Sequence, residues 1–120
     1  MVMLDTNMIL RYLLNDNPDM AEQAEQYLDS GETTVTTEVI AEVVYVLKGV
    51  YGLERGAIAD TLKDFLALVN CREEDVLRVA LDAYATYSLD FVDCVLYGYH
   101  RVRHATVATF DKKLLKMMNH

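Results

Sequence analysis

Apolar residues recur along this chain of 120 residues at two spacings, one typical of helices and the other of strands. Apolar positions three and four residues apart predict helices at residues 7–15, 18–30, 37–50, 53–68, 74–87 and 89–103, and a last helix from residue 112. Short apolar or β-branched runs predict strands at residues 2–4, 33–36, 69–72 and 106–109. Strands that alternate with helices predict an α/β fold with a parallel sheet and right-handed crossovers.

The breaks between these segments leave no room for a linker. The chain has one proline and five separate glycines, without a repeat or a low-complexity tract. Its hydrophobic content of 52% is enough for a core, so residues 1–120 predict a single domain. We expect the second and third strands on one side of the first strand and the fourth strand on the other. A ligand crevice would then open at the carboxyl ends of the first and fourth strands.

Four acidic residues occupy positions where the pattern favours other residue types. Asp5 and Asp111 each follow a predicted strand and precede a helix. Glu42 lies within the valine-rich run of the third helix, and Asp93 shares its side of the sixth helix with apolar positions 89, 92, 96 and 99. The predicted topology brings all four acids to the crevice. Because clustered carboxylates repel one another at low dielectric, this arrangement predicts a bound cation.

The ligand types indicate which cation this would be. Mg²⁺ and Mn²⁺ prefer oxygen ligands, keep several waters and need only one or two direct carboxylates. Such an ion polarises a phosphoryl oxygen and lowers the pKa of a bound water. The acids therefore predict phosphodiester hydrolysis that needs no serine or cysteine nucleophile.

The charge and cysteine content narrow the function classes. With 11 basic and 19 acidic residues the net charge is −8, which argues against a simple electrostatic nucleic-acid binder. A metal-dependent nuclease stays compatible, because the ion changes the local field. Cys71 and Cys94 cannot form the disulfide framework of a small secreted domain. Without a signal-like or membrane-spanning segment, we expect a soluble, cytoplasmic protein with no membrane partner.

Four segments together resemble PIN-domain ribonucleases of the VapC toxin type. They are Asp5-Thr6-Asn7, the helix with Glu42, Asp90-Phe91-Val92-Asp93, and Thr109-Phe110-Asp111. The resemblance covers nearly the whole chain. It implies a three-layer sandwich in which helices cover a parallel sheet of four or five strands, the fifth being a last strand for which little chain remains after Met118.

The same resemblance implies a chemistry and a set of partners. Asp5, Glu42, Asp93 and Asp111 would bind Mg²⁺ or Mn²⁺ as catalytic residues, with support from Thr6, Asn7 and Thr109. Water would cut an RNA substrate. The protein would form a homodimer, and a cognate antitoxin protein would block the acidic crevice.

Each of these residues also has a plain structural interpretation. Asp5 and Asp111 are good helix caps. Asp90 lies near the predicted start of a helix, where a negative charge interacts favourably with the helix dipole. We therefore expect Asp93 as the ligand and Asp90 in a structural role. Glu38, one turn before Glu42, has the same ambiguity. The candidates for phosphate contact are basic residues near the carboxyl end, namely His100, Arg101, Arg103, His104, Lys112, Lys113 and Lys116.

Two other function classes stay open at this point. A phosphoacceptor signalling domain also builds an acidic metal pocket at strand ends, although it usually has adjacent acids where this chain has Asp5-Thr6. A catalytically inactive scaffold would keep the fold for protein binding alone. A stable aspartyl phosphate formed from a small phosphodonor would favour the first class, and absence of divalent metal binding would favour the second.

Overall fold

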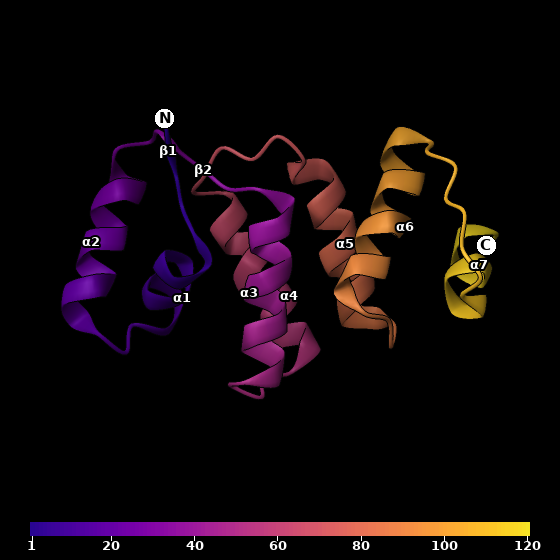
Figure 1. Ribbon diagram of the computed structural model, residues 1–120, viewed down its shortest axis with the longest axis horizontal. Coiled ribbons are helices and arrows are strands. Elements are labelled where there is room, and N and C mark those ends of the chain that lie inside the picture. Colours follow the sequence, from indigo (N-terminus) through magenta and orange to yellow (C-terminus); the bar gives the residue numbers. More distant parts are fainter.

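The computed structural model describes all 120 residues as seven helices and two short strands (Figure 1). No helix combines the length and the apolar character that crossing a membrane requires. The elements, in chain order, are β1 (Val2–Met3), α1 (Thr6–Leu14), α2 (Pro18–Asp29), β2 (Thr33–Thr34), α3 (Thr37–Gly49), α4 (Arg55–Leu66), α5 (Glu74–Thr86), α6 (Phe91–Arg103) and α7 (Lys112–Met118).

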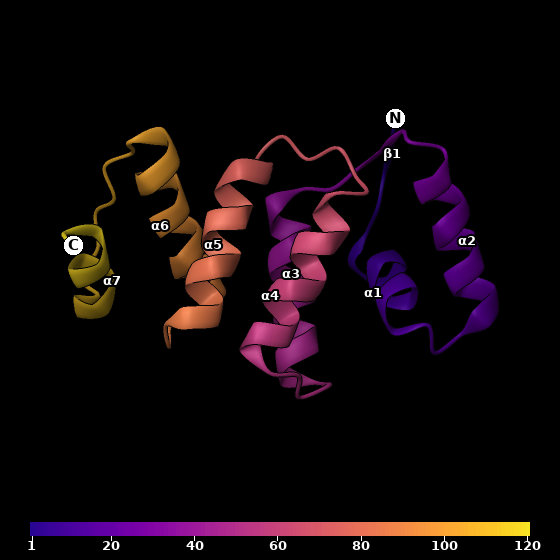
Figure 2. The same cartoon turned by 180° about the vertical axis from the view of Figure 1, so that it is seen from behind.

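The helices stand roughly side by side along the longest dimension of a molecule that measures 46 × 30 × 18 Å. Figures 1 and 2 show α1 and α2 at one end, α3 and α4 in the middle, and α5, α6 and α7 towards the other end. The apolar core joins these parts, and α5 packs against both α4 and α6. The largest fully buried side chains include Phe65 of α4, Ile40 of α3 and Leu81 of α5.

The sheet is parallel, as predicted, but it is much smaller than expected. Val2 pairs with Thr33 and Met3 with Thr34, and the Leu4 N–H donates to the Thr34 carbonyl at 3.0 Å. Residues 69–72 contribute only an isolated parallel bridge, from Asn70 to Thr34. The order β1, β2, Asn70 agrees with the expectation that the second and third strands lie on the same side of the first strand. A four- or five-stranded sheet between two helical layers is not formed.

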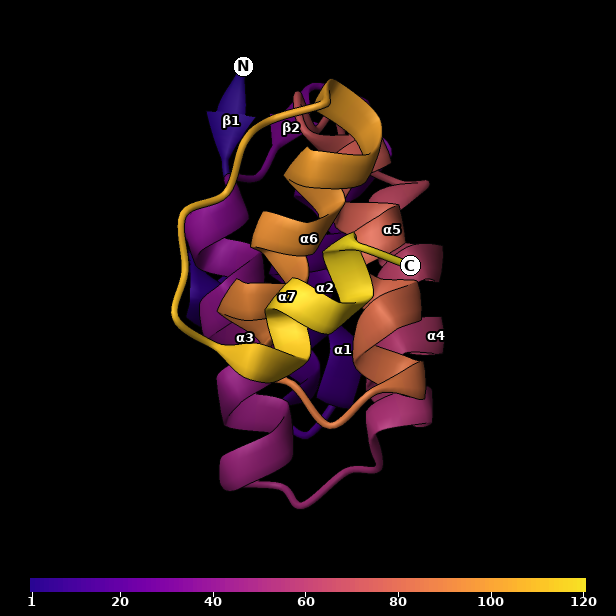
Figure 3. The ribbon, with the colours of Figure 1, turned by 90° about the vertical axis from the view of Figure 1, so that its right-hand side faces the viewer.

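The predicted strand at residues 106–109 is wrong for this structure. Residues 104–110 form neither helix nor strand, although their burial alternates as in a strand. His104 adopts the left-handed conformation (φ 56°) and turns the chain back, and a ring nitrogen of His100 lies 3.0 Å from the Ala105 carbonyl oxygen. This segment therefore runs along α6 towards α7 (Figure 3), whereas β1 lies at the other end of the molecule (Figure 1).

The helix predictions are confirmed, with small shifts at their ends. Asp5 caps α1, since its side chain accepts the Met8 N–H at 2.8 Å. Asn17 caps α2 in the same way, with Pro18 at the first helical position. Helix α4 begins two residues later than predicted, and so does α6.

The buried side of α6 differs from the predicted apolar stripe. Phe91, Cys94, Val95 and Gly98 face the core, whereas Val92 is 61% exposed. Gly98 marks the closest approach of α6 to α5, because a Cβ added there would lie 2.7 Å from the carbonyl oxygen of Val76. A glycine inside a helix usually lowers stability, so this position reflects close packing of the two helices.

This contact predicts the effect of two glycine substitutions. Gly98→Ala should lower the free energy of unfolding by about 1–3 kcal/mol, because α6 must move away from α5 to admit the methyl group. Gly56→Ala in α4 is the matched control, since nothing lies within 4 Å of its added Cβ. There we expect a gain of about 0.5–1 kcal/mol from helix propensity. Urea unfolding followed by circular dichroism measures both, and equal effects would contradict the packing argument.

Candidate functional site

The first acidic pair consists of Asp5, which precedes α1, and Glu42, which lies in α3. Asp5 directly follows the buried Leu4 at the end of β1, and one of its carboxylate oxygens caps α1. The Thr6 hydroxyl donates a hydrogen bond to the Glu42 carboxylate. Helix α1 packs against α3, so this hydrogen bond lies across a helix contact. Two of the predicted site acids are therefore brought to the same part of the molecule.

The second acidic pair consists of Asp93, which lies in α6, and Asp111, which precedes α7. Asp93 lies in the first turn of α6, and the Asp111 side chain caps α7 by accepting the Leu114 N–H at 2.8 Å. The Thr109 hydroxyl oxygen accepts the backbone N–H of Asp111 at 3.0 Å, which holds the chain just before the cap. Both acids line an open recess of about 400 Å³, here called the acidic recess.

The electrostatics of the second acidic pair are unfavourable without a cation. Burial, followed by the negative charges of Asp111 and Asp90, raises the pKa of Asp93 above its ordinary value. Asp90, Lys112 and Lys113 also line the acidic recess, yet none of the four predicted acids belongs to an ion pair. Two uncompensated carboxylates are the oxygen ligands that Mg²⁺ or Mn²⁺ prefers, and one or two are enough when water completes the coordination. The donor set therefore fits such an ion.

The structure does not bring all four acids into one pocket. No group of three or more histidine, cysteine, aspartate or glutamate side chains lies close enough to hold a metal ion. The first acidic pair belongs to β1, α1 and α3, and the second belongs to α6 and α7. The separation follows from the course of residues 104–110, which carry Asp111 to α7 instead of placing it beside β1.

The other candidate residues differ in the contacts that their side chains make. Thr6 and Thr109 each make a hydrogen bond to a predicted acid or to its backbone. Asn7 is exposed in the first turn of α1, and Glu38 is exposed in the first turn of α3. Asp90 occupies the cap position of α6 but makes no capping hydrogen bond, so the expected structural role has no contact to support it.

One residue that shapes the site was not singled out from the sequence. The Arg55 guanidinium donates to the backbone carbonyl of Tyr84 at 2.7 Å and to that of Leu89, and it lies 3.7 Å from the centre of the Tyr84 ring. It thereby ties α4 to the turn between α5 and α6, just before Asp90 and Asp93. A single arginine in a polar stretch gives no sequence signal for such a role.

The basic candidates for phosphate binding differ in the partners that they already have in the structure. Arg103 is ion paired with Asp75 and Glu73, and the Arg103 guanidinium lowers the pKa of Asp75. The ring nitrogens of His100 lie 3.0 Å and 3.3 Å from backbone carbonyl oxygens, so this side chain holds the connection to α7. Arg101, Lys112, Lys113 and Lys116 belong to no ion pair. These four cations remain free to meet an anion.

Comparison with known proteins gives one match. The family model described as PIN domain matches residues 2–118, which is nearly the whole chain. Neither the curated proteins nor the solved structures provide a match. PIN domains are nuclease-type domains and usually use divalent metal ions. The chain belongs to the PIN domain family.

Proposed function

We propose that this chain is a metal-dependent endoribonuclease that hydrolyses RNA phosphodiester bonds. Its family supports a nuclease-type hydrolase that acts on nucleic acid. The observation that carries the proposal is the second acidic pair, in which Asp93 and Asp111 face one recess and neither has an ion-pair partner. The raised pKa of Asp93 means that its charge lowers stability unless a ligand compensates it, and a perturbed carboxylate in a recess is typical of functional sites.

In this proposal the second acidic pair holds Mg²⁺ or Mn²⁺. When bound, the ion would supply a polarised phosphoryl oxygen and a water of lowered pKa. Asp111 uses one carboxylate oxygen as a helix cap and keeps the other for a ligand, and Thr109 holds the chain in front of it. Asp5 and Glu42 are the proposed further acids of the site, with the Thr6 hydroxyl fixing the orientation of Glu42.

We further propose the role of toxin in a type II toxin–antitoxin pair of the VapC type, acting in the cytoplasm as a homodimer. The motifs around Asp5, Asp93 and Asp111 support this role. Tyr45 is 76% exposed and Phe110 is fully exposed, so each offers apolar surface that a protein partner would bury. A second copy of the chain and an antitoxin would cover such side chains.

The competing functions receive less support. A phosphoacceptor domain needs a second acid beside Asp5, where this chain has Thr6 and Asn7. The PIN domain match also favours a nuclease over that class. An inactive protein-binding scaffold stays the alternative that a cleavage assay tests directly.

Cleavage of labelled RNA tests the proposal. In Mg²⁺ or Mn²⁺ the protein should cut RNA, and EDTA should abolish the reaction. Asp93→Asn and Asp111→Asn should each lower the rate on the order of 100-fold or more, because they remove a charge that would face the cation. Asparagine caps helices about as well as aspartate, so Asp111→Asn preserves the cap of α7.

The matched control for these variants is Asp64→Asn on α4, an exposed aspartate outside both acidic pairs. This variant should cleave at the rate of the unchanged protein. Full activity of Asp93→Asn, or cleavage that persists in EDTA, would contradict the proposed metal site.

The raised pKa of Asp93 predicts a gain in stability on losing this charge. The folded state binds this proton more tightly than the unfolded state, so ionised Asp93 lowers stability at neutral pH. In EDTA at pH ~7, Asp93→Asn should therefore raise the melting temperature, and the difference should shrink as the pH falls towards ~4.

Added Mg²⁺ should then stabilise the unchanged protein more than Asp93→Asn. Differential scanning fluorimetry measures both effects, and Asp64→Asn should show neither. A lower melting temperature for Asp93→Asn at neutral pH would contradict the electrostatic account of the second acidic pair.

A further inference from the structure

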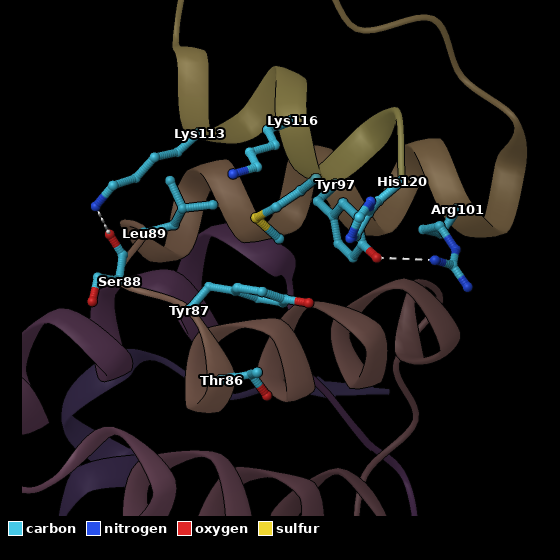
Figure 4. A pocket seen from close by; sticks show the side chains of 10 residues that line it. Thr86, Tyr87, Ser88, Leu89, Tyr97, Arg101, Lys113, Lys116 and His120 are labelled. Atoms are coloured by element: carbon cyan, nitrogen blue, oxygen red, sulfur yellow. Dashed lines mark hydrogen bonds between the residues drawn. The ribbon is translucent and has the colours of Figure 1, made fainter.

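A cavity of about 550 Å³ lies between the carboxyl end of α5, the outer part of α6, and α7. Figure 4 shows Lys116 and Arg101 around it, with the ring of Tyr87 lying below α7 and Tyr97 beside Arg101. Lys113 and His120 also line it, and no acidic residue does. We call this the basic cavity. Its volume is that of a small-ligand pocket.

The three Lys and Arg residues of the basic cavity have no carboxylate partners, whereas four of the other eight in the chain do. Arg11, Lys63, Arg78 and Arg103 are all ion paired. By contrast, Arg101 donates to the phenol oxygen of Tyr97 at 3.0 Å, and Lys113 reaches only the Ser88 carbonyl, at 3.4 Å. Lys116 makes no ion pair. A chain of net charge −8 thus leaves three positive charges together around one cavity, which favours an anionic ligand.

Aromatic side chains add a second preference. Tyr87 is 45% exposed, and its ring lies across the gap between α5 and α7. The Arg101 guanidinium lies 5.8 Å from the centre of the Tyr97 ring. Cations next to partly exposed aromatic rings match a nucleotide, whose phosphate meets the charges while its base stacks on a ring. A simple acidic peptide would use the cations but would gain little from the tyrosine rings.

The basic cavity adjoins the acidic recess. Ser88, Leu89 and Lys113 line both, and Lys113 lies two residues after Asp111. If one phosphodiester of a nucleic-acid strand lies at the second acidic pair, the next nucleotide of the strand would therefore lie in the basic cavity. A base stacked within a duplex cannot enter such a cavity, whereas an unpaired base can.

We propose that the basic cavity binds one nucleotide of single-stranded RNA next to the phosphodiester that is cut. Arg101, Lys113 and Lys116 bind the phosphates, and Tyr87 stacks on the base. The assignment of the neighbouring phosphodiester rests on the proposed ribonuclease function. The binding of the nucleotide itself rests on the cavity alone, so binding without metal tests it separately.

Fluorescence anisotropy with a short labelled oligouridine in EDTA measures this binding without cleavage. Lys116→Gln and Arg101→Gln should each weaken binding and lower the slope of log affinity against log salt concentration by about 0.7. The control is Lys48→Gln, at the end of α3, whose lysine also has no ion pair but lies outside the basic cavity. It should change neither quantity.

The stacking part of the proposal has its own signature. Tyr87→Ala should weaken binding roughly 5- to 150-fold without changing the salt slope, and Tyr87→Phe should retain the affinity because it keeps the ring. Tyr87 is at the exposed end of α5, and circular dichroism melting checks that each variant is folded.

Several outcomes would overturn the proposal. They are absence of RNA binding by the unchanged protein, equal losses for Lys48→Gln and Lys116→Gln, and displacement of the RNA by oligoglutamate as readily as by unlabelled oligouridine. The last outcome would assign the basic cavity to acidic protein segments. Binding that depends on the basic cavity in a protein that cuts no RNA would refute the ribonuclease and leave the nucleotide site intact. Cleavage without any effect of these variants on binding would refute the nucleotide site alone.

Discussion

The close packing of α6 on α5 at Gly98 determines where the charged groups of this protein lie. Helix α6 carries Asp93 in its first turn and Arg101 in its last, so its position sets both the acidic recess and the basic cavity. The missing side chain at Gly98 allows the approach, and Arg55 fixes the preceding turn through two backbone carbonyls. An apolar helix contact and the partly buried guanidinium of Arg55 thus hold carboxylates and cations that would not assemble by their own attraction.

The helices were predictable because their signals are local. Apolar spacing and capping residues such as Asp5 and Asn17 specify where each helix begins, without reference to the rest of the chain. The strands depend on pairing partners far away in the sequence. The run at residues 106–109 has the composition and the alternation of a strand, but the left-handed turn at His104 and the contacts of His100 direct it along α6 instead. Local pattern carries no information about that choice.

The candidate site shows the same division between local and distant information. Asp5 and Asp111 were recognisable from their places before helices, and the structure places both at caps. The grouping into two pairs, rather than one cluster, depends on where α7 docks, which no motif specifies. Arg55 escaped prediction because its partners are backbone carbonyls, and any sequence supplies those.

The charge of the whole chain says little about what these recesses bind. Charges separated by more than about 8–10 Å of solvent are screened at physiological ionic strength, so a ligand responds to the groups that line its own pocket. Here Asp90, Asp93 and Asp111 line one recess, Arg101 and Lys116 line the other, and Lys113 lines both. A cation and a phosphate would each find opposite charge within neighbouring recesses of an acidic protein. The acidic recess has three carboxylates beside two lysines, whereas the basic cavity has cations and no acidic side chain. This local difference, rather than the net charge of the chain, decides which ion each of them favours.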